Sequence, residues 1–195
     1  MGREVRRVPL DWVHPSEPNG QARPLIGGNF LKAVVAEYDF EKMKWEQGFF
    51  KKTDYTNYCE HGGKPEVTWE PKTEEHEGTF AEWNGERPRA EDYMPVYDES
   101  EKVGYQMYET TTEGTPISPV FKDPEQLAHW LADTGASAFG GYTSTYEEWL
   151  AMIVGPGYSM SAIFTPGEGM QSGVSAISNS GMYATDKRET ITDKE

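Results

Sequence analysis

The chain has 195 residues, a formal net charge of −15 and an aromatic content of 13%. Its length suits one domain with a sizeable core, and its negative charge disfavours direct binding to nucleic acids or anionic lipids. One cysteine, Cys59, excludes an internal disulfide bond, and no apolar run reaches the roughly 18 residues of a membrane span, so we expect a protein of a reducing cytoplasm.

Residues 1–30 are predicted to form an extended N-terminal arm. The segment is rich in Pro and Gly, but Val5 and Val8 supply apolar surface that can hold it on the body as an edge strand. Its three arginines, Arg3, Arg6 and Arg7, are expected to pair with carboxylates of the chain itself. Contact with an external phosphate is the weaker alternative.

Residues 31–177 are predicted to form a single α+β domain that begins with a helix. Apolar residues recur at helical spacing from residue 31 to about residue 50, and Gly48 supplies a stop signal. Lysines and glutamates alternate along the same stretch, which is typical of a solvated helix face.

Residues 60–101 form an acidic middle with 13 Asp and Glu against 4 Lys and Arg, a net charge of −9. One interpretation is an irregular loop layer that its tryptophans fix on the core, and the other is an acidic surface that a basic partner recognises. Under the second interpretation, rings and carboxylates together are the candidate contacts. These candidate partner-binding residues are Trp69, Glu74, Glu75, Glu77, Phe80, Trp83 and Tyr93.

Residues 104–155 carry the clearest signals and are predicted to be the core, as a strand followed by two helices. A period-two pattern over residues 105–110 indicates a strand with one buried face. Asp123 is placed to cap the first helix, which Gly135 ends, and Ser144 to cap the second, which Gly155 ends.

Tryptophans are expected to anchor this core. Trp130 and Trp149 lie on the apolar stripes of the two helices, so both should be largely buried and should pack with Tyr105 or Tyr108.

After the core we expect a hairpin and a polar tail. Residues 159–165 should pair with residues 170–177 across a Pro-Gly-Glu-Gly turn, and residues 178–195 have no apolar face. The predicted fold class is therefore α+β, with a small antiparallel sheet, two or three short helices, an aromatic-rich core and a long irregular acidic loop region.

Motifs that would indicate chemistry are missing. Cys59, His61 and His76 are the only candidates for a soft metal site, and one Cys without paired spacing does not predict zinc. Nucleophile-elbow and phosphate-loop motifs are both absent, so we predict neither a cofactor nor a metal, and an enzyme is the less favoured class.

Six blocks of the sequence resemble a family of uncharacterised proteins encoded by bacteriophages and prophages. They are REVRRVPLDWVHP at residues 3–15, GERPRAEDYMP at 85–95, GYQMYETTTEGTPISPVF at 104–121, LAHWLADTGASAFGG at 127–141, TYEEWLAMI at 145–153 and MQSGVSAI at 170–177. The resemblance implies an accessory protein made inside a bacterial host cell. It carries over no catalytic or binding residues.

The leading hypothesis is a phage-encoded accessory protein that binds a host or phage protein without catalysis, with counter-defence as one such role. Its partner would present a basic face, and the protein would act in the cytoplasm of the host cell. Two alternatives stay open: an acidic DNA mimic that inhibits a nucleic-acid-binding defence protein, and a small enzyme whose active site has no linear motif.

Overall fold

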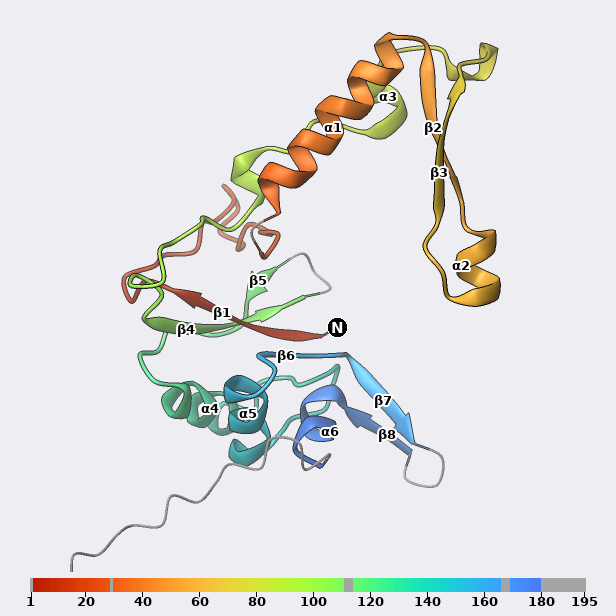
Figure 1. Cartoon of the computed structure of the whole chain (residues 1–195). Coiled ribbons are helices and arrows are strands. Elements are labelled where there is room, and N and C mark those ends of the chain that lie inside the picture. The colour runs from red at the N-terminus through yellow and green to blue at the C-terminus, as the bar shows by residue number, and fades with distance from the viewer. Residues whose placement is uncertain (1, 29, 111–113, 166–168, 180–195) are drawn as a thin grey trace, which may run out of the picture. The chain divides into compact units, whose positions relative to one another are not determined.

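The computed structural model describes residues 2–28, 30–110, 114–165 and 169–179 (Figure 1). The contacts within the chain form two compact units: the first unit is Met1–Gly27 with Pro95–Glu195, and the second unit is Gly28–Met94. These boundaries differ from the single domain expected over residues 31–177, because the second unit has an aromatic core of its own.

The α+β prediction is confirmed: helices accompany small antiparallel sheets and buried aromatic residues. The described residues contain six α-helices, α1 to α6, rather than two or three.

The first unit is built on a four-stranded antiparallel sheet in the order β5-β4-β1-β6. Its strands are β1 (Arg3–Val8), β4 (Gly104–Glu109), β5 (Thr115–Pro116) and β6 (Tyr158–Ser159). The N-terminal segment therefore supplies an inner strand, and the expectation of an edge strand was wrong. The reason is that both edges of β1 are paired, along its whole length with β4 and at Arg3 and Glu4 with β6.

Strand β4 is buried on both faces, although its pattern predicted one buried face. Met107 packs into the core on one side, while Gln106 and Tyr108 face the other side, where Trp12 and His14 contact Tyr108. The polar Gln106 is tolerated there because its Nε2 donates a hydrogen bond to the Ser118 carbonyl oxygen at 2.9 Å.

The arginines of β1 are partnered within the chain. Arg3 pairs with Glu109 at 3.4 Å and Arg6 with Glu4 at 3.2 Å, as expected. Arg7 instead donates to main-chain carbonyls and lies over the ring of Tyr105, 4.0 Å from its centroid.

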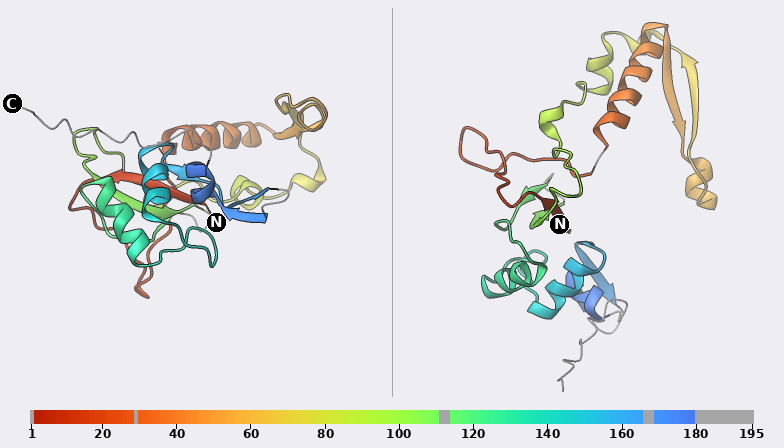
Figure 2. Two further views of the ribbon diagram at one scale, coloured as in Figure 1. Left: turned by 90° about the horizontal axis from the view of Figure 1, so that it is seen from below. Right: turned by 60° about the vertical axis from the view of Figure 1, so that its left-hand side comes forward.

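Helices α4 (Pro124–Asp133) and α5 (Tyr146–Val154) lie beside one face of the sheet (Figures 1 and 2). Asp123 occupies the N-cap of α4 but makes no side-chain capping bond. Thr145, rather than Ser144, caps α5 and forms a capping box with Glu148. The hydroxyl of Ser144 turns inward, where it lies within 3.4 Å of Ser172 and Ser175.

The core of the first unit joins both helices to β4. Trp149 is completely buried within it, as predicted, and Trp130 and Tyr105 pack against it only partly buried. The other fully buried members include Met107, Leu127, Leu131 and Met152.

The C-terminal hairpin is shorter than expected. Strands β7 (Ala162–Thr165) and β8 (Gly169–Ser172) pair antiparallel, but residues 173–177 form helix α6 (Gly173–Asn179) instead of extending the strand. The Ser172 hydroxyl accepts a hydrogen bond from the Ser175 main-chain N–H at 3.0 Å, which favours a helix start at this point. Most of the predicted tail, residues 180–195, lies outside the described residues.

The second unit begins with the predicted helix, α1 (Leu31–Glu46), which ends just before Gly48. A two-stranded ribbon of β2 (Phe49–Asp54) and β3 (Glu66–Pro71) follows, with α2 (Thr56–His61) at its turn. The rest consists of the short helices η1 (Glu74–His76), α3 (Phe80–Asn84) and η2 (Ala90–Asp92). Residues 60–94 of the acidic middle thus fold with α1, and residues 95–101 belong to the first unit.

Candidate functional site

All seven candidate partner-binding residues belong to the second unit, but they do not form one surface. Phe80 is buried in its core, whereas Trp83 is 50% exposed. Trp69 packs on Phe40 with ring centroids 5.7 Å apart, and Tyr93 makes no ring contact within the described residues. The structure therefore brings Phe80, Trp83 and Trp69 to the lining of one pocket, described below, and leaves Tyr93 outside that lining.

Six rings from four elements make up what we call the ring cluster. Trp45 lies 5.4 Å from Trp83, and His76 lies 3.9 Å from Phe50 and 4.7 Å from Trp83, measured between ring centroids. The members are Tyr38 and Trp45 of α1, Phe50 of β2, His76 of η1, and Phe80 and Trp83 of α3. Such contacts provide the burial that the few aliphatic residues of this unit do not.

His76 is a structural member of this cluster. Its side chain is buried, and its Nδ1 accepts a hydrogen bond from the Thr73 main-chain N–H at 3.2 Å. The same nitrogen lies 2.9 Å from the Thr73 hydroxyl, so the ring caps the turn that carries it. From the sequence, His76 was a candidate metal ligand or a solvated loop residue, and the Thr-x-x-His spacing was the signal that could have revealed its capping role.

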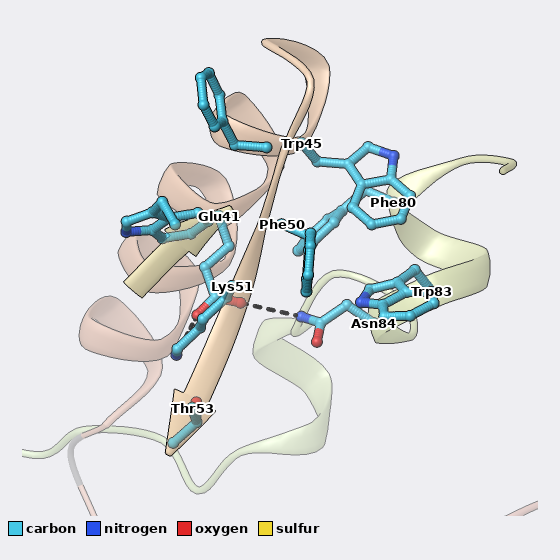
Figure 3. A pocket seen from close by; sticks show the side chains of 10 residues that line it. Glu41, Trp45, Phe50, Lys51, Thr53, Phe80, Trp83 and Asn84 are labelled. Atoms are coloured by element: carbon cyan, nitrogen blue, oxygen red, sulfur yellow. Dashed lines mark hydrogen bonds and ion pairs between the residues drawn. The ribbon is translucent and has the colours of Figure 1, made fainter. Parts of the chain in front are cut away.

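A pocket of about 250 Å³ opens beside the ring cluster. Figure 3 shows the rings of Trp45, Phe50, Phe80 and Trp83 gathered on one side, with Glu41 and Lys51 on the other. The remaining lining residues are Phe49, Thr53, Trp69 and Asn84.

The polar end of the pocket is centred on Glu41, which is 9% exposed. One carboxylate oxygen, Oε1, accepts a hydrogen bond from Lys51, and the other, Oε2, meets Asn84 Nδ2 at 3.5 Å. Lys51 also binds Glu37 at 2.9 Å. These bonds to Glu41 and Glu37 raise the pKa of Lys51, and the bond from Lys51 lowers the pKa of Glu37. One ammonium group thus serves two carboxylates.

Three glutamates adjoin His76 of the ring cluster in sequence, and no cation of the described residues neutralises their carboxylates. Glu74 and Glu75 precede His76 and Glu77 follows it; all three are exposed, and none is paired within the described residues. Glu82, by contrast, is engaged in the capping box of Thr79, whose hydrogen bonds lower the pKa of this carboxyl. We call Glu74, Glu75 and Glu77 the acidic rim.

A second pocket, of about 500 Å³, shares Trp45 and Phe80 with the first. Lys72 is one of its lining residues, and its Nζ lies 4.2 Å from the centroid of Trp45. Lys44 Nζ likewise lies 5.9 Å from the centroid of Trp69, so aromatic faces of this unit already hold two cations of the chain.

The first unit contains a buried hydrogen-bond network that the sequence did not indicate. Trp12 Nε1 donates to the Tyr108 hydroxyl, which also meets His14 Nδ1 at 3.2 Å and donates to Gln106. His14 Nε2 lies 2.7 Å from the Arg23 carbonyl oxygen, so this nitrogen carries a hydrogen. Burial raises the pKa of Tyr108 and lowers that of His14. Through Trp12, His14 and Arg23, this network holds the segment of residues 9–27 against the buried Tyr108 of β4.

The described part of the chain offers no grouped ligands for a metal ion. No three His, Cys, Asp or Glu side chains are placed there to hold an ion. Cys59 is exposed on α2, and the side chain of His61 lies outside the described residues. None of the helices described is long and apolar enough to span a lipid bilayer.

Comparison of the chain with protein-family models, curated proteins and solved structures finds no match.

Proposed function

We propose that the chain acts by binding a protein partner without catalysis, and that the second unit provides the contact surface. The observation that carries this proposal is the acidic rim beside the ring cluster. Exposed carboxylates that the chain does not neutralise attract a basic face, and a half-exposed Trp83 offers an aromatic anchor next to them.

The phage resemblance supports a role as an accessory protein in the cytoplasm of a bacterial host, with a host or phage protein as partner and counter-defence as one such role. The partner would present a basic surface, because the acidic middle of residues 60–101 has a net charge of −9. The DNA-mimic and enzyme hypotheses stay predictions without a specific observation in their favour.

The test reverses the charge of the acidic rim. Tagged chain is produced in phage-infected bacteria, and captured proteins are identified by mass spectrometry for three versions. These are the wild type, the triple variant Glu74→Lys/Glu75→Lys/Glu77→Lys, and the matched control Asp11→Lys/Glu125→Lys/Asp133→Lys in the first unit. The control changes the charge equally at exposed residues.

We expect one basic partner to be captured by the wild type and the control and lost by the rim variant. With purified partner, the rim variant should also associate more slowly and with a weaker salt dependence, since such attraction is screened beyond about 8 Å at physiological salt. Equal capture by all three versions would contradict the proposal, as would equal loss in both triple variants.

A further inference from the structure

The carboxylate of Glu41 has an incompletely used oxygen at the wall of the pocket. Its Oε1 is engaged by Lys51, but the contact of its Oε2 with Asn84 is 3.5 Å long, at the limit of a hydrogen bond. A nearly buried carboxylate normally has its lone pairs well satisfied, so Oε2 can accept a stronger donor from a ligand.

The charge at this end of the pocket favours a cationic donor. Among the residues that line the pocket, Glu41 pairs with Lys51. Glu37 lies outside the lining but binds the same ammonium, so the two carboxylates and the one ammonium leave one negative charge in excess. The acidic rim adds further negative charge nearby, because Glu74, Glu75 and Glu77 flank His76, which stacks on the pocket residue Phe50. An anionic ligand would be repelled.

The rest of the wall is aromatic apart from Thr53, and the pocket is small. Faces of Trp and Phe attract cations, and a planar guanidinium both stacks on a ring and presents N–H groups in a fork that matches a carboxylate. About 250 Å³ is less than the roughly 300–1,000 Å³ of pockets that enclose whole small molecules. The space therefore suits one side chain.

We propose that this pocket receives an arginine side chain of the protein partner, whose guanidinium donates to Glu41 Oε2 and stacks against the rings of Trp45, Phe50 or Trp83. This inference rests on the proposed function, and it specifies what the basic partner inserts. The acidic rim would then attract the partner, and the pocket would select arginine over lysine, whose ammonium lacks the planar fork.

The test uses small probes rather than the partner. N-acetyl-arginine methylamide and N-acetyl-citrulline methylamide have nearly the same shape, but only the first is charged. Each is titrated into isotope-labelled protein while the Trp indole N–H and Asn84 side-chain NMR signals are followed. We expect the arginine probe to shift the signals of Asn84 and Trp83 and the citrulline probe to leave them unchanged at the same concentration.

Two variants on α1 refine the test. Glu41→Gln should weaken the arginine probe about tenfold, the factor that corresponds to about 1.4 kcal/mol, the scale of a charged hydrogen bond. Glu46→Gln removes the same charge outside this pocket and should leave the affinity unchanged. The comparison of the two probes on wild-type protein needs no variant, so it decides the matter even where Glu41→Gln fails to fold.

Failure of this inference can be told from failure of the proposed function. Equal responses to both probes, or binding that survives Glu41→Gln, would overturn the arginine site. Partner capture that still depends on the acidic rim would then leave the proposed function intact.

Discussion

Trp149 provides a prediction in which burial and hydrogen bonding oppose each other. Its ring is fully buried, and its Nε1 makes no hydrogen bond with any described residue. Trp149→Ala removes the whole ring and should lower the free energy of unfolding by about 3–5 kcal/mol. Trp149→Phe loses packing worth roughly 1–2 kcal/mol, but it also removes a buried N–H whose desolvation costs about 1–3 kcal/mol. The two effects should nearly cancel, so this variant should be close to the wild type in stability.

Trp12 in the same unit is the matched control. It is only half-buried, but its Nε1 donates to the Tyr108 hydroxyl at 3.2 Å. Trp12→Phe therefore loses a hydrogen bond worth about 0.5–1.5 kcal/mol with no compensating gain. Urea unfolding followed by far-UV circular dichroism should show Trp12→Phe to be the less stable of the two Phe variants. The opposite order, which burial alone predicts, would refute the reasoning about Nε1.

Three further predictions concern a helix cap, a histidine and a metal. Thr145→Ala should cost about 1 kcal/mol of stability because Thr145 caps α5, whereas Asp123→Ala should cost less because Asp123 makes no side-chain cap bond, and urea midpoints compare them. Burial, with Arg6 nearby, lowers the pKa of His14, so the native state binds that proton less readily than the unfolded chain. Stability should therefore fall as the pH drops below the unfolded value of about 6.5, and less steeply in His14→Gln. Elemental analysis should find well under one equivalent of zinc; one tight equivalent lost on Cys59→Ser would contradict this.

The fold could be predicted where its signals are local. Pro124 and Gly135 bound α4 as the sequence indicated, because caps and stops depend on residues only a few positions apart. The inner position of β1 could not be predicted in this way. A strand with three arginines resembles an exposed edge. Arg3 is nevertheless buried, and its guanidinium pairs with Glu109 and donates to the carbonyl oxygen of Ser137, 134 positions away.

The candidate site shows the same limit. Its acidic rim was among the residues expected from composition, and so were Phe80 and Trp83. Glu41 was missed, because it lies in a helix whose mixed charges indicated a solvated face. Its burial depends on the ribbon of β2 and β3, which returns alongside α1 and places Lys51 beside Glu41. Because this contact joins a helix to a strand, neither the helical nor the strand periodicity of the sequence predicts it.

Under the proposed function, the ring cluster both holds the second unit together and contributes to recognition, and only some residues can separate these two roles. Small units bury a smaller fraction of their surface than large ones, so loss of Trp45 or Phe80, which are 4% and 7% exposed, should unfold the unit as well as abolish binding. Such a variant would say nothing about recognition. The exposed carboxylates of the acidic rim and the underused oxygen of Glu41 contribute charge rather than packing. Recognition by this unit is therefore to be tested at its glutamates, because the rings that would contact a partner are also the rings that hold the unit together.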